Sequence, residues 1–190
     1  MSFENLTMRS LGSDAYVLGT PIEVLDGAAT VGVVRTVVLA STGDEILLGD
    51  FEAANQADFL ARRIAKLVIA EVVNFVATTY EAISAIEIML GRDIDGFEGR
   101  QAYLAQARAD LLQSIGVRNV QVAPKPVRGK EAHFAVSGLW AYDSPSLEAL
   151  RSVLQAERAA YAQFKAAQVA TAPSPPRRRS VLSRVFAPND

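Results

Sequence analysis

The stretch Glu52–Leu90 constrains the possible folds of this 190-residue chain more than any other. It contains no proline and no glycine, and its apolar residues recur at spacings of three and four from Leu60 through Ile64 to Leu90. This pattern predicts one long helix, or two helices nearly end to end, at the centre of the fold. The remaining polar strip is narrow, which indicates that the helix contacts protein on more than one side.

The apolar run Leu67–Leu90 is long enough to cross a bilayer, which takes about 20 residues. It also carries Glu71, Asn74, Glu81 and Glu87. Each carboxylate near the middle of a bilayer costs about 2.5–3.5 kcal/mol. The sequence therefore favours a core helix over a membrane span.

The residues before the helical stretch predict strands. Ala15–Leu18 and Ile22–Leu25 flank a proline, Val31–Ala40 is rich in β-branched residues, and a Ser-Thr-Gly-Asp turn leads into Glu45–Phe51. Together residues 15–51 predict a three-stranded antiparallel meander.

The residues after it predict a helix over Phe97–Ile115, and then a second hairpin over residues 117–142. Ser144 and Pro145 suit the N-cap and first turn of a last helix that ends near Gln168.

The predicted fold class is α+β, with antiparallel hairpins or a meander around the long central helix of residues 52–90 and two further helices, in the order βββ-α-α-ββ-α. Two small sheets and one mixed sheet both satisfy this order. The predicted organisation is an N-terminal arm over residues 1–13, a single domain over 14–169, and a tail over 170–190 that is rich in proline and arginine.

Few residues suggest chemistry. The chain has no cysteine, which excludes disulfides, thiolate metal sites and cysteine nucleophiles. His133 is the only histidine, and Ser137 lies four residues along the same predicted strand, roughly 13 Å away, too far for a nucleophile–base pair. We therefore expect no catalytic, cofactor-binding or metal-binding residues, and no enzyme activity.

Two acidic patterns have structural explanations. Glu71, Glu81 and Glu87 lack the Glu-x-x-His partner that metal-binding helical bundles use. The loop 91–99 departs from the calcium-loop pattern and from the phosphate-loop pattern, so turn formation accounts for its aspartates and glycines.

The C-terminal segment is the most distinctive feature outside the predicted core. Prolines precede a cluster of arginines and apolar residues that we predict to bind a partner: Arg177, Arg178, Arg179, Val181, Leu182, Arg184, Val185 and Phe186. The segment could dock on a neighbouring subunit, bind an anionic membrane or nucleic acid, or remain solvated. The net charge of −2 gives no strong nucleic-acid signal for the whole chain.

These observations favour a non-catalytic structural or assembly protein, either a homo-oligomer or a subunit of a larger bacterial or phage particle. We expect other protein subunits as partners, no cofactor, and a cytoplasmic or virion-associated location. The first alternative is an adaptor that attaches through the arginine-rich segment. The second is a small cofactor-independent enzyme or ligand-binding domain, whose pocket would gather residues such as Glu81, His133, Tyr142 and Asp143.

Overall fold

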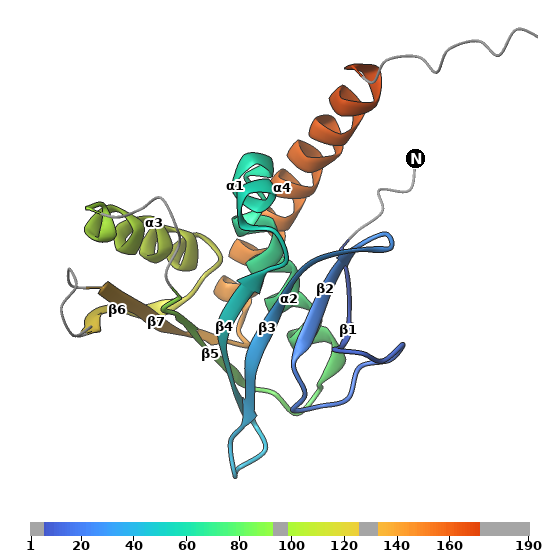
Figure 1. Ribbon diagram of the computed structural model, residues 1–190. Coiled ribbons are helices and arrows are strands. Elements are labelled where there is room, and N and C mark those ends of the chain that lie inside the picture. Colours follow the sequence, from blue (N-terminus) through green and yellow to red (C-terminus); the bar gives the residue numbers. More distant parts are fainter. Residues whose placement is uncertain (1–5, 93–98, 126–132, 172–190) are drawn as a thin grey trace, which may run out of the picture.

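A seven-stranded mixed sheet organises the fold in the computed structural model, which describes residues 6–92, 99–125 and 133–171 (Figure 1). The strand order is β1-β2-β3-β4-β5-β7-β6, and every neighbouring pair is antiparallel except β4 and β5. The strands are β1 (Thr7–Ser10), β2 (Ile22–Asp26), β3 (Ala29–Leu39), β4 (Glu45–Ala53), β5 (Ala85–Leu90), β6 (Arg118–Lys125) and β7 (His133–Ala141). The helices are α1 (Gln56–Arg62), α2 (Ala65–Thr79), α3 (Gln101–Ser114) and α4 (Ser144–Thr171).

This architecture confirms the α+β class and chooses the single mixed sheet. The predicted meander is β2–β3–β4, and the second hairpin is β6–β7. The N-terminal part differs from expectation, because Thr7–Ser10, within the expected arm, forms edge strand β1. Ala15–Leu18, expected as a strand, lies in the turns that join β1 to β2.

The prediction of one long helix, or two helices nearly end to end, over Glu52–Leu90 is wrong. The stretch contains the end of β4, two helices, and strand β5. Ile86 and Leu90 fit a helical spacing, but Ile86, Ile88 and Leu90 fit the alternation of a strand equally well. Ile86 and Ile88 are buried while Glu87 between them is exposed, which is the strand pattern.

Helix α2 nonetheless forms the centre of the core. Nine of its residues are buried: Leu67, Val68, Ile69, Ala70, Glu71, Val72, Val73, Val76 and Ala77. One side packs on the sheet and another on α4. Burial inside one chain therefore accounts for the narrow polar strip, with no need for a second subunit.

The buried carboxylate of Glu71 is neutralised within the core. Its side chain is 4 % exposed and accepts two hydrogen bonds from Arg158 of α4, at 2.6 Å from Nε and 2.7 Å from Nη2. A bidentate pair of this kind compensates the desolvation of the carboxylate only while both partners are present. The pair fixes α4 against α2.

The helices cover one face of the sheet. Leu48 and Ile88 meet Ile69, Val72 and Val73 of α2 on that face. Trp140, which pairs with Ile86 across β5 and β7, donates a hydrogen bond of 3.1 Å to the carbonyl of Ile115 at the end of α3. The residues that alternate with these point the other way, and Figure 1 shows strands β3 and β4 in front of α2 and α4. Among the described residues, no helix covers this second face, which we call the open face.

None of the helices in residues 6–92, 99–125 and 133–171 combines the length and the apolar character that crossing a bilayer requires.

The Glu71–Arg158 pair gives a test of the core. We expect Arg158→Met to lower the free energy of unfolding by about 2–4 kcal/mol, because it leaves a buried carboxylate unpaired. The double variant Glu71→Met/Arg158→Met should recover much of that loss. Urea unfolding of the two single variants and the double variant measures the coupling. Additive losses would show that the two side chains do not interact.

Candidate functional site

The parallel strands β4 and β5 separate before they end. Their pairing runs from Glu45 with Ala85 to Gly49 with Met89. Beyond this point β4 continues to pair with β3 as far as Ala53, and β5 continues to pair with β7 at Leu90. In open sheets, ligands bind beyond the carboxyl ends of parallel strands, at the point where the strand connections diverge.

Asp50 lies where the two strands part. It is the next residue of β4 after the last β4–β5 pair, and its φ of 54° lies in the left-handed region. Aspartate adopts this conformation more readily than most residues, and Thr36 Oγ1 donates a hydrogen bond of 2.8 Å to Asp50 Oδ2. Asp50 therefore marks the point at which β4 loses its pairing with β5 while its register with β3 continues unchanged.

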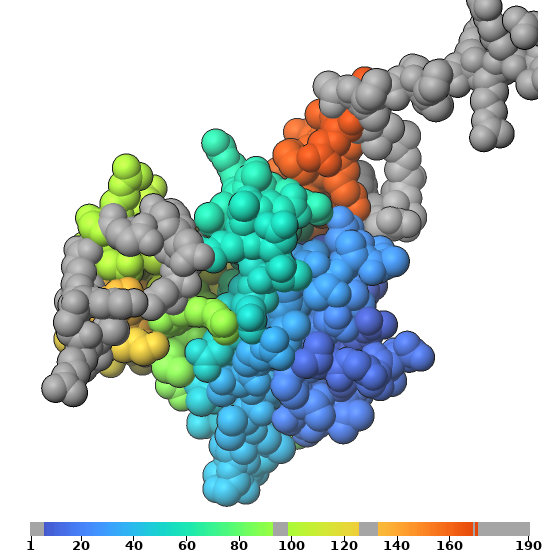
Figure 2. All heavy atoms as spheres, in the orientation of Figure 1, coloured from blue at the N-terminus to red at the C-terminus, as the bar shows by residue number. Residues whose placement is uncertain are grey.

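A cleft of about 730 Å³ opens beyond the separation. Its walls come from the ends of β4 and β5, from α1 and the start of α2, and from one side of α3; Figure 2 shows α1 in teal and α3 in yellow-green on either side of a hollow. The volume lies within the range of small-molecule sites, which is about 300–1,000 Å³. The larger apolar residues of the lining are Phe51, Phe59, Leu60, Ile69, Leu90, Tyr103, Leu104 and Leu111.

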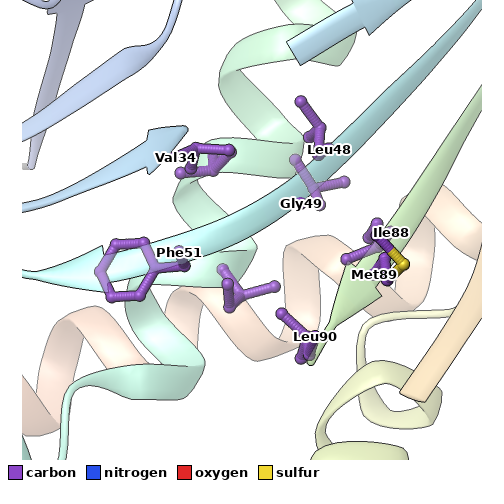
Figure 3. A pocket seen from close by; sticks show the side chains of 10 residues that line it. Val34, Leu48, Gly49, Phe51, Ile88, Met89 and Leu90 are labelled. Atoms are coloured by element: carbon purple, nitrogen blue, oxygen red, sulfur yellow. The ribbon is translucent and has the colours of Figure 1, made fainter. Parts of the chain in front are cut away.

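The floor of the cleft is apolar. A small hollow of about 10 Å³, no larger than a water molecule needs, shares Phe51, Ile69 and Leu90 with the cleft. Figure 3 shows β4 and β5 side by side at Leu48 and Ile88 and apart at Phe51 and Leu90. An apolar group that enters the cleft therefore meets a closed surface at the strand separation.

Among the described residues that line the cleft, basic side chains outnumber acidic ones. These basic side chains are Arg63, Lys66, Arg92 and Arg108, and the carboxylates are Glu52 and Asp110. Arg92 lies 3.3 Å from Glu52, and Lys66 lies 3.6 Å from Glu157. The hydrogen bond from Arg35, followed by the charges of Arg92 and Arg35, holds the pKa of Glu52 below its ordinary value.

Arg63 differs from Arg92 and Lys66 because no acidic group pairs with it in the part of the chain that the structure describes. It is the C-cap of α1, in a left-handed conformation with φ of 55°, and lies two residues before the first residue of α2. No side chain caps the first turn of α2, whose dipole favours negative charge at this end. Charge and dipole both favour an anion beside Arg63.

Gln56 contributes an unused donor to the cleft wall. Its Nε2 is buried and has no hydrogen-bond partner among the described residues. A buried donor without a partner costs about 1–3 kcal/mol. An acceptor atom of a ligand would remove that cost.

Polar contacts help to hold α1 in place, since α1 has no fully buried residue and only Phe59 packs against the core. Arg62 donates a hydrogen bond of 3.3 Å to the Tyr161 hydroxyl, and this hydroxyl donates a hydrogen bond of 2.7 Å to Asp26. Lys165 donates a hydrogen bond of 2.8 Å to the same carboxylate. Burial tends to raise the pKa of Asp26, but the bonds from Lys165 and Tyr161 outweigh it and the pKa is lowered. We call Asp26, Arg62, Tyr161 and Lys165 the α1 anchor.

The pocket residues considered from the sequence do not converge. His133 begins β7 and Tyr142 follows its end, so the strand separates them by roughly 30 Å. Asp143 caps the start of α4 and pairs with Arg118 at 2.7 Å, and Glu81 is exposed in the turn before β5. Ser137 lies on the same strand as His133, as predicted.

Several predicted features lie outside the described residues. These are most of the acidic loop, residues 93–98, and the whole partner-binding segment from Arg177 to Phe186. In the described ranges, no three acidic or histidine side chains gather as metal ligands. Because the segment from Arg177 to Phe186 lies outside the described residues, its binding to a partner stays a prediction.

The sequence analysis missed the cleft because its residues are far apart in the chain. They come from five segments between Phe51 and Ser114, and none carries a short motif. One available signal was the end of the apolar alternation at Asp50, followed by Asn55, a residue that favours helix N-caps. In the structure the Asn55 side chain accepts a hydrogen bond of 3.0 Å from the backbone amide of Asp58.

Comparisons with known proteins add little to this geometry. No family model and no curated relative matches the chain. Among solved structures, the chain is similar to the N-terminal domain of ribosomal-protein-alanine acetyltransferase from Clostridium acetobutylicum ATCC 824. The TM-score is 0.45 and the sequence identity 8 %, over 73 % of this chain and 92 % of that chain.

The α1 anchor predicts a pH dependence. The folded pKa of Asp26 is depressed, so its stabilisation is present above the unfolded pKa near 3.9 and is lost as the pH falls through the folded pKa. Asp26→Asn should cost about 1–2 kcal/mol at pH 7 and progressively less below about pH 4. Urea unfolding at pH 7 and pH 3 measures both values, with Asp14→Asn, an exposed change, as the control. An equal cost at both pH values would contradict the ionised role of Asp26.

Proposed function

We propose that the chain binds a small molecule with an acidic group and an apolar group in the cleft beyond β4 and β5. The separation of the two strands is the observation that carries this proposal, because it creates a deep opening with an apolar floor. Arg63 and Lys66 would hold the acidic group, and Phe51, Leu90 and Leu104 would contact the apolar group.

The arrangement of polarity supports such a ligand over a purely apolar one. Among the described residues, Arg63 has no acidic partner and Gln56 Nε2 has no hydrogen-bond acceptor. Hydrogen bonds to charged groups contribute about 1.5–3 kcal/mol, so an anion gains more from these groups than a neutral molecule does. The expectation that the chain is not an enzyme remains a prediction.

Octyl phosphate tests this proposal, because it joins one anionic group to one apolar chain. We expect it to bind the full-length protein more tightly than inorganic phosphate or 1-octanol by isothermal titration calorimetry. Inorganic phosphate can pair only with the basic side chains of the cleft, and 1-octanol can contact only its apolar lining. Equal affinity for all three would contradict the proposal.

Matched variants locate the binding. Arg63→Gln should weaken the binding of octyl phosphate by about tenfold or more, since the substitution removes one charged hydrogen-bond donor. Arg151→Gln removes the same charge from the exposed side of α4 and should leave the affinity unchanged. Leu104→Trp should obstruct the cleft without changing its charge. Equal effects of Arg63→Gln and Arg151→Gln would place the ligand elsewhere.

The open face of the sheet favours a second candidate, the structural or assembly function expected from the sequence. Val38 is 53 % exposed and Leu139 is 37 % exposed on this face, and no described helix covers them. We propose that the chain also associates with copies of itself. Light scattering of the full chain over a range of concentrations tests this candidate, and a monomer at every concentration would contradict it.

A further inference from the structure

We infer that the open face binds the C-terminal segment of a second copy, residues 181–186. This inference rests on the assembly candidate and names the partner of that surface. The segment reads Val-Leu-Ser-Arg-Val-Phe, so apolar residues lie within two positions of Arg184 on each side. It lies outside the described residues, and the surface that would receive it lies within them.

The receiving surface is one row of side chains across neighbouring strands. Val38 pairs with Leu47, Leu47 with Glu87, Glu87 with Leu139, and Leu139 with Arg118. Residues paired across strands lie on the same face of a sheet, so these side chains form a continuous row. The row places apolar groups on both sides of the carboxylate of Glu87. We call Val38, Leu47, Glu87 and Leu139 the sheet patch.

The charges of the sheet patch point to a basic partner. Glu87 is exposed and has no basic partner in the described part of the chain, whereas Arg118 at the end of the row is already paired with Asp143. A single carboxylate between apolar groups complements a single cation between apolar groups. Arg184 with its neighbours Leu182 and Val185 has that composition.

The same charges disfavour face-to-face packing of two open faces. Glu87 lies at the middle of the row, so a two-fold pairing centred on the patch would set its carboxylate against its copy. Like charges directly opposite are destabilising. Binding of the C-terminal segment avoids this repulsion.

The position of α4 favours a second copy over the same chain. Helix α4 begins beside Ser84 at the start of β5, where the Tyr142 amide donates a hydrogen bond of 2.8 Å to the Ser84 carbonyl, and its 28 residues extend about 42 Å. Its end therefore lies in the helical layer, roughly 30 Å from Glu87, on the other side of the sheet from the open face. The segment of the same chain would have to pass around the edge of the sheet to reach Glu87, whereas a second copy can present its segment to the open face directly.

Charge reversal in the full-length chain tests this inference by light scattering or sedimentation. Glu87→Arg alone, and Arg184→Glu alone, should each weaken self-association by about tenfold or more. Glu148→Arg on the exposed side of α4 and Arg178→Glu in the tail make the same charge changes away from the proposed contact and should have little effect. Thermal unfolding checks that the Glu87 variant is folded, and Val38→Lys provides an independent change in the same patch.

Mixing the two variants gives the decisive measurement. Glu87→Arg chains carry an intact segment, and Arg184→Glu chains carry an intact sheet patch, so each pair of unlike chains has one original and one reversed contact. Self-association should return on mixing. Recovery only when both changes are in one chain would show binding within a single molecule and overturn the inference.

Two outcomes separate this inference from the assembly candidate beneath it. If the unmodified chain is monomeric at all concentrations, both are wrong. If it associates and the variants at Glu87 and Arg184 associate equally well, the assembly candidate stands and the C-terminal segment is not the partner.

Discussion

The separation of β4 from β5 after Gly49 is the constraint on which the candidate binding site depends. A sheet whose central parallel strands stayed paired to their ends would bring Phe51 and Leu90 together and leave no cleft between them. Asp50, with its left-handed backbone, lies at the position where the two strands part, and Thr36 donates a hydrogen bond to its carboxylate. A cleft of about 730 Å³ opens directly beyond this residue.

Two kinds of interaction then fix what surrounds the cleft. Helix α2 is held by apolar burial on several sides and by the pair of Glu71 with Arg158. Helix α1, which forms the outer wall, has no fully buried residue and is held by Phe59 packing on Phe51 and by the α1 anchor formed with β2 and α4. The rear of the cleft is therefore built from the core, while one wall is held in part by polar and ionised side chains. Changes in α4 can reach the cleft through this wall.

The sequence predicted those parts of the fold that local patterns determine. The meander, the β6–β7 hairpin and the last helix followed from β-branched runs, turn residues and a Ser-Pro helix start, although the side chain that caps this helix is Asp143 and not Ser144 as predicted. The error over Glu52–Leu90 arose because Ile86 and Leu90 satisfy both periodicities, and only pairing with β4 and β7 decides between them. The cleft could not be predicted, since it depends on which strands become neighbours. Arg63 and Gln56 acquire their importance only from that arrangement.

The most direct test of the central claim, that the strand separation forms a ligand site, is a backbone amide NMR titration of the full-length protein with octyl phosphate. The account predicts saturable shifts concentrated at Phe51, Gln56, Arg63, Leu90 and Leu104, with the distant β3–β4 turn at Gly43 unchanged. Shifts that are absent, or that spread over the surface without saturating, would contradict it.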